Sequence, residues 1–118
     1  MQQKSKSEEI EKLREFLKDN GIELVFSSET ENYIDHTNDT VVISDSQPPK
    51  QIIYTILHEI GHYFLDIHFE EQNKTTTVIE EVLAWDRGYD IGQTLRIEID
   101  DIEWRELMER CIGEYIEQ

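Results

Sequence analysis

The chain has 118 residues, which suits one compact domain and is too short for two separate hydrophobic cores. It carries 27 acidic and 11 basic side chains, and its formal net charge of -16 excludes nucleic-acid binding through phosphate neutralisation. The same charge disfavours docking on anionic lipid. The composition therefore predicts one small acidic domain over residues 1–118, with residues 1–7 flexible.

Cysteine content and hydropathy predict where the protein works. Cys111 is the only cysteine, so the chain can form no internal disulfide, and a reducing compartment is favoured. The first seven residues have no apolar core of a signal peptide, and no apolar run approaches the roughly 18 residues of a membrane span. We expect a cytoplasmic protein.

The N-terminal half predicts one helix followed by three strands. Ser7 can cap a helix that ends at Asn20-Gly21, where glycine favours a left-handed turn. Residues 22–26 alternate in polarity and predict a strand. Residues 33–35 and 40–43 predict the two strands of a hairpin around the polar turn 36–39.

The C-terminal half predicts three helices. Prolines 48 and 49 mark the start of a helix that runs to about Phe64 with a broad apolar stripe. A polar loop over 66–76 precedes a helix from about Thr77 to Leu95, and a last helix begins near Asp100. This order predicts an α+β fold with a small three-stranded sheet.

The motif His58-Glu59-Ile60-Gly61-His62 has the pattern H-E-x-x-H on a predicted helix. Residues i and i+4 share a helix face, so both imidazoles can reach one metal ion. Glu59 lies beside them and can orient a water molecule and accept its proton. The motif predicts a zinc site with His58 and His62 as ligands and Glu59 as the catalytic residue.

A catalytic zinc site needs a third protein ligand, and the sequence offers two candidates. His68 lies ten residues after His58, as in the metzincin pattern, but Leu65 stands where that pattern requires glycine. Glu81 lies nineteen residues after His62 on the next predicted helix. Glu81 shares a helix face with small residues at 84, 88 and 92, and small residues allow another helix to approach closely. Glu80 does not lie on this face.

These two motifs resemble those of the ImmA/IrrE-type zinc metallopeptidases, which carry H-E-[LI]-G-H and a downstream E-x-x-A-N. Residues 58–62 match the first motif, and residues 81–84 match the first four positions of the second. The resemblance covers roughly residues 8–95. It implies a zincin-like fold, zinc bound by His58, His62 and Glu81, and Glu59 as general base and acid. Members of the family commonly act on transcriptional regulators in bacteria and mobile elements.

The chain departs from the family at the last position of the second motif, where Trp85 replaces asparagine. Asp86 is a candidate for the missing contact. An oxyanion donor is also needed, and the sequence leaves four candidates. They are Tyr33, His36, Tyr63 and His68.

The leading hypothesis is a small zinc-dependent metalloendopeptidase that cleaves a cytosolic protein or peptide, without direct nucleic-acid or membrane binding. One alternative is a non-catalytic acidic protein that occupies the basic cleft of a nucleic-acid-binding partner, since charge can steer such association. Another is a degenerate peptidase that keeps zinc for structure alone.

Overall fold

The computed structural model describes residues 6–28, 32–65 and 69–117. Over these residues the fold is α+β, with four helices and a three-stranded mixed sheet, which confirms the predicted class. The chain divides into two compact units, Met1–Glu59 and Ile60–Gln118, and the boundary falls inside helix α2 (Pro49–Tyr63).

The first unit begins with helix α1 (Lys6–Asp19), which contacts strand β1 (Glu23–Ser27). Leu13 and Leu17 are fully buried on the apolar face of α1. The helix ends at Asp19, directly before the predicted stop at Asn20-Gly21. Gly21 has a φ of 76°, and the amide of Ile22 donates to the carbonyl of Leu17. Ser7, the predicted cap, lies inside the first turn because the helix already begins at Lys6.

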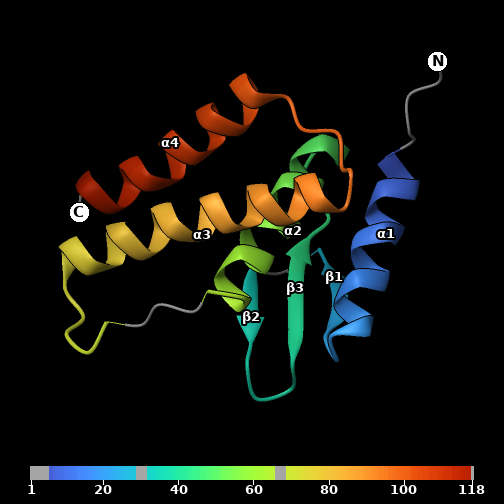
Figure 1. Cartoon of the computed structure of the whole chain (residues 1–118), viewed down its shortest axis with the longest axis horizontal. Helices are drawn as coiled ribbons and strands as arrows, with labels where there is room; N and C mark the ends of the chain where they lie inside the picture. Colours follow the sequence, from blue (N-terminus) through green and yellow to red (C-terminus); the bar gives the residue numbers. More distant parts are fainter. Residues whose placement is uncertain (1–5, 29–31, 66–68, 118) are drawn as a thin grey trace. The chain divides into compact units, whose positions relative to one another are not determined.

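The sheet has the order β1-β3-β2, as Figure 1 shows. Strands β2 (Tyr33–Asp35) and β3 (Thr40–Ser44) pair antiparallel, which confirms the predicted hairpin. Strand β3 also pairs with β1 in parallel, a pairing that the sequence did not predict. Its position at the centre of the sheet explains its apolar run, because Val41, Val42 and Ile43 are all buried.

Asp35 organises the hairpin turn. Its carboxylate accepts hydrogen bonds from the side chain of Asn38 at 2.8 Å and from the backbone amides of Thr37 and Asn38 at 3.0 and 3.2 Å. These bonds, led by the one from the Asn38 side chain, lower the pKa of Asp35 below its usual value of 3.8. The turn also uses Asp39 in the left-handed region, at a φ of 48°.

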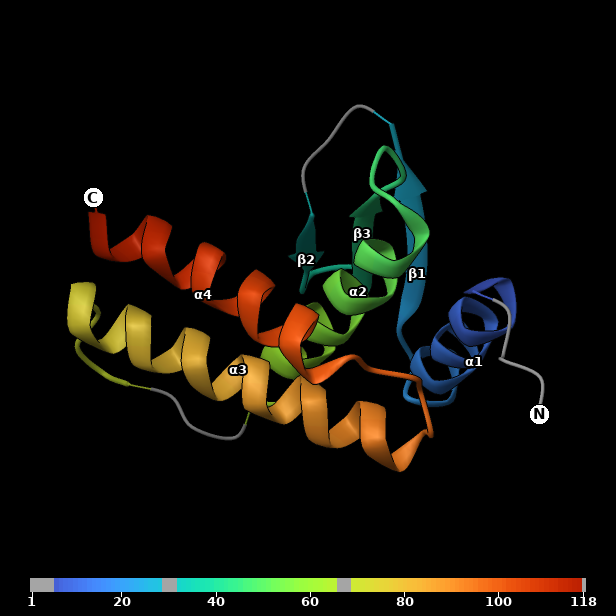
Figure 2. The same cartoon turned by 90° about the horizontal axis from the view of Figure 1, so that it is seen from above.

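The second unit contains helices α3 (Lys74–Thr94) and α4 (Asp101–Glu117), which run side by side in opposite directions (Figure 2). Their packing centres on the buried Trp85 and Trp104, whose rings meet edge to face with centroids 4.9 Å apart. Tyr89 joins this contact and donates a hydrogen bond to Asp101 at 2.7 Å. Trp85 and Trp104 therefore form the core between these two helices.

Helix α3 begins at Lys74, three residues before the predicted start. Asn73 and Thr76 form a capping box: the Asn73 side chain accepts from the Thr76 amide, and the Thr76 hydroxyl accepts from the Asn73 amide. Residues 74–76, predicted to be loop, form the first turn for this reason. Helix α4 begins next to Asp100, as predicted, and the Asp100 side chain caps it by accepting from the amides of Ile102 and Glu103.

Within the described part of the chain, no helix combines the length and the apolar character that crossing a membrane requires.

Candidate metal centre

Helix α2 places His58 and His62 on one face, one turn apart. The helix is held by a dense apolar stripe in which Ile53, Ile56 and Leu57 are fully buried. The two histidines flank this stripe and remain partly accessible, with side chains 12% and 29% exposed. Both imidazoles are thus partly accessible, although the Nε2 atom of His58 is itself buried.

The last turn of α2 packs very closely against α3. A Cβ atom at Gly61 would overlap the carbonyl oxygen of Ala84 and would lie 3.0 Å from the amide nitrogen of Gly88. Ala84, Gly88 and Gly92 are all buried on the same face of α3, as the spacing predicted. Small residues on both helices therefore allow their backbones to touch at this point.

This close approach brings Glu81 of α3 to His62. Glu81 is only 3% exposed, and its Oε2 atom contacts the Nε2 atom of His62. Glu80 occupies a different face of the helix and accepts a hydrogen bond from Gln72 at 3.2 Å. The structure therefore distinguishes the two adjacent carboxylates in the way that helix geometry predicted.

His58, His62 and Glu81 together form a group that could hold a metal ion. Each offers one ligand atom, and these atoms all lie within 4.8 Å of one another. Two imidazoles and one carboxylate are a suitable donor set for a divalent transition metal. The three ligands predicted from the two sequence motifs are thus brought together by α2 and α3.

Glu59 follows His58 directly and is also largely buried, with its side chain 12% exposed. Its Oε1 atom lies 3.9 Å from Nδ1 of His58, beyond hydrogen-bonding distance. A carboxylate next to a metal-ligand group can accept a proton from a nearby water molecule. Glu59 therefore lies beside His58 and is not part of the group of three potential ligands, and its catalytic role stays a prediction.

The competing third ligand, His68, lies outside the described residues. Three other predicted oxyanion donors are described. Tyr33 is 46% exposed on β2, His36 is exposed in the hairpin turn, and the ring of Tyr63 lies 5.4 Å from that of Phe64. Their catalytic role stays a prediction.

The departure at Trp85 has a structural explanation. Its side chain is 1% exposed and packs on Trp104, so this position serves the α3–α4 core rather than a polar contact to the ligands. Asp86, the suggested substitute, is exposed and lines a cavity of about 270 Å³ with residues of α3 and α4 such as Tyr89 and Arg105. The packing of Trp85 in this core accounts for the departure from the motif, and a comparison of the motifs alone could not reveal it.

Comparison of the chain with models of protein families, with curated proteins and with solved structures finds no match.

Proposed function

We propose that this protein is a zinc-dependent metallopeptidase of zincin-like architecture that hydrolyses a peptide bond in a cytosolic protein such as a transcriptional regulator. The observation that carries the proposal is the grouping of His58, His62 and Glu81 with a further carboxylate, Glu59, adjacent in sequence. The similarity of both motifs to those of the ImmA/IrrE-type peptidases supports the same reaction.

Zinc is the metal that this donor set favours. Sites with two histidines, one glutamate and an open position are characteristic of catalytic zinc in peptidases, whereas structural zinc sites are usually closed by four protein ligands. The described chain offers one group of three suitable residues and no fourth ligand within it. Three protein ligands are the number that a catalytic zinc site uses.

The residues then have separate tasks. His58, His62 and Glu81 bind the metal. The burial of Glu81 keeps water, which would compete with the metal, away from its carboxylate. A bound zinc ion supplies Lewis-acid chemistry, lowering the pKa of water and polarising a carbonyl group. Glu59 accepts the proton of the attacking water on its carboxylate and returns it to the leaving amine.

The proposal is tested by metal analysis and peptide cleavage on the same preparations. The protein is purified without added zinc as the natural sequence and as Glu59→Gln, His62→Ala and Glu114→Gln, the last a matched change at an exposed position of α4. Each preparation is assayed for bound metal by mass spectrometry and for cleavage of a mixture of unstructured peptides.

We expect about one zinc per chain in every form except His62→Ala, as a single three-ligand site requires. Cleavage should be lost in Glu59→Gln and in His62→Ala and retained in Glu114→Gln. Metal without cleavage in the natural sequence would instead favour the degenerate peptidase with structural zinc. Absence of metal from all four forms would refute the proposal.

A further inference from the structure

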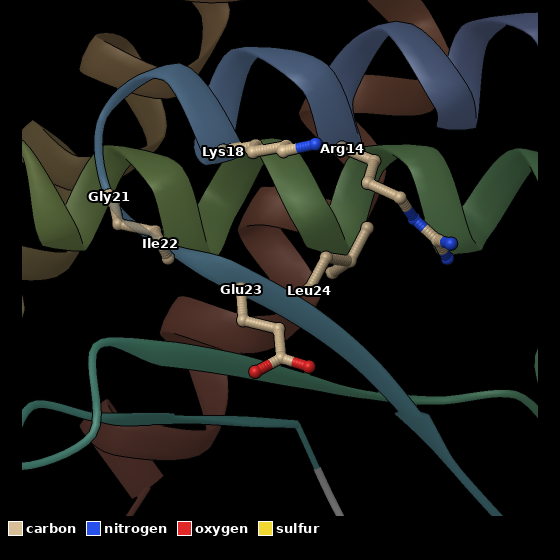
Figure 3. A pocket seen from close by; sticks show the side chains of 6 residues that line it. All are labelled: Arg14, Lys18, Gly21, Ile22, Glu23 and Leu24. Carbon is tan, nitrogen blue, oxygen red and sulfur yellow. The ribbon is translucent and has the colours of Figure 1, made fainter.

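A cavity of about 450 Å³ lies in the first unit, where the end of α1 meets the start of β1. Its volume falls within the range of roughly 300–1,000 Å³ that is typical of small-ligand sites. Six residues line it (Figure 3): Arg14, Lys18, Gly21, Ile22, Glu23 and Leu24. The cavity is separate from the residues proposed to bind metal.

Two basic side chains dominate the polar part of this cavity. Arg14 and Lys18 project from the same face of α1, one helical turn apart, while the Glu23 carboxylate points away from them on the other side of β1 (Figure 3). The lining holds two basic residues and one acidic residue, so its formal charge is +1 in a chain whose net charge is -16. This electrostatic arrangement favours an anion.

Arg14 has donor capacity to spare. Its Nη1 atom lies 3.6 Å from the exposed carboxylate of Glu11, a separation too long for a good hydrogen bond. Its guanidinium also lies over the ring of Phe26, with Cζ 5.7 Å from the centroid. Its Nε atom is buried and has no hydrogen-bond partner within residues 6–28, 32–65 and 69–117. A buried N–H without an acceptor is unfavourable, and a rotation of the Arg14 side chain that turned Nε towards an anion in the cavity would give it one.

The end of α1 does not repel such an anion strongly, because its carbonyl groups are already engaged. Asn20 donates to the carbonyl of Phe16 at 2.8 Å, and the amides of Ile22 and Gly21 donate to the carbonyls of Leu17 and Lys18. Satisfied carbonyls carry less of the negative end of the helix dipole. The basic side chains therefore set the local potential.

The rest of the cavity is apolar. Ile22 and Leu24 are buried, and Leu24 points from β1 towards α1 (Figure 3). We propose that this cavity binds a carboxylate joined to a small apolar group, with Arg14 and Lys18 holding the carboxylate and Ile22 and Leu24 contacting the apolar part. A planar guanidinium suits a carboxylate because it can donate two parallel hydrogen bonds.

The full chain is titrated with each probe, and binding is monitored through the amide chemical shifts of residues 21–24. The probes are hexanoate, the dipeptide N-acetyl-alanyl-leucine with a free C-terminal carboxylate, and hexanamide as the uncharged match. The variants are Arg14→Gln, Lys18→Gln and Arg87→Gln, the last the same charge change at an exposed position of α3.

We expect the amide chemical shifts to change saturably with at least one of the two carboxylate probes and to stay unchanged with hexanamide. Binding to Arg14→Gln and Lys18→Gln should be weaker by roughly fivefold or more, as for a partly exposed charged hydrogen bond. Arg87→Gln should match the natural sequence. Preference for the dipeptide would identify a peptide terminus as the ligand, and preference for hexanoate a free carboxylic acid.

The proposal is overturned if neither carboxylate binds, if hexanamide binds equally well, or if all three variants bind as tightly as the natural sequence. Should Arg14→Gln fail to fold because it loses its contact with Phe26, Lys18→Gln still decides the question, since Lys18 is exposed on the helix surface.

Discussion

Gly61 of α2 lies directly against the carbonyl group of Ala84 in α3, with no room for a side chain between them. A Cβ atom at Gly61 would be 2.8 Å from the carbonyl carbon of Ala84 and closer still to its oxygen. One residue further along α2 is His62, and one turn earlier on α3 is Glu81. The glycine therefore sets the helix separation at which these two side chains meet.

Gly61→Ala should destabilise the fold and weaken metal binding. The obstructing atoms belong to backbone, which cannot rotate aside, so the helices must separate; overpacking of this kind costs about 1–3 kcal/mol. Denaturant unfolding and zinc titration measure the two effects.

Gly113→Ala is the matched control, because nothing lies within 4 Å of a Cβ atom at that position of α4. It should raise the free energy of unfolding by about 0.5–1 kcal/mol through helix propensity and leave zinc affinity unchanged. Equal behaviour of the two alanine variants would contradict the packing role of Gly61.

Glu81→Gln should remove a metal ligand, while Glu80→Gln should not. Both variants replace a carboxylate with an amide at neighbouring positions, but only Glu81 is buried against His62. Zinc affinity should fall in Glu81→Gln by more than the roughly 10- to 100-fold that is typical when a residue supporting a ligand is lost. Competition with a chromogenic chelator measures both affinities. If Glu80→Gln shows the larger loss, the ligand assignment is wrong.

Zinc should stabilise the folded protein through mass action. At a free zinc concentration 100 times the dissociation constant, the expected gain in free energy of unfolding is about 2.7 kcal/mol. Thermal unfolding with zinc and with a chelator measures it. The gain should vanish in His62→Ala, because the remaining residues of the group are too few to hold the ion. A gain of the same size in that variant would place the metal elsewhere.

Tyr89 should titrate above its ordinary pKa of 10.0. Its hydroxyl donates to Asp101, and this hydrogen bond is the main reason that the pKa of Tyr89 is raised, with desolvation next. Because the folded pKa is raised, the hydrogen bond contributes its full stability below pH 10 and loses it as the pH rises through the folded pKa.

The measurement is a ¹³C NMR titration of labelled tyrosine, with Tyr89→Phe to assign the signal. Asp101→Asn should lower the pKa of Tyr89 towards 10.0, and Asp90→Asn should lower it less, because Asp90 contributes the weakest of the interactions. A Tyr89 signal that titrates at or below pH 10.0 in the natural sequence would contradict this account.

Helix and strand positions were largely predictable because they depend on short-range patterns. Local signals predicted all four helices, such as the stop at Asn20-Gly21 and the apolar stripe that ends near Phe64. Asp100 marked the start of α4, and its side-chain oxygen caps that helix. Helix α3 begins three residues before its predicted start because Asn73 and Thr76 form a capping box. Both residues of the box stand in the sequence, so this start depends on a local pattern as well.

The order of the strands could not be predicted in the same way. Adjacent residues define a hairpin between β2 and β3, but the parallel pairing of Glu23 with Thr40 joins segments separated by the whole of β2. Such a pairing depends on which faces are buried once the chain is compact. No local pattern encodes it.

The sequence by itself determined the two histidines of the candidate metal site and the carboxylate beside them, because i and i+4 positions share a face on any α-helix. It also limited the third ligand to two candidates, His68 and Glu81. Tertiary structure decided that Glu81 meets His62, since this depends on two helices whose small residues let their backbones touch at Gly61 and Ala84. Residues distant in sequence are brought together only by such packing. Arg14 and Leu24 likewise line one cavity because α1 packs against β1.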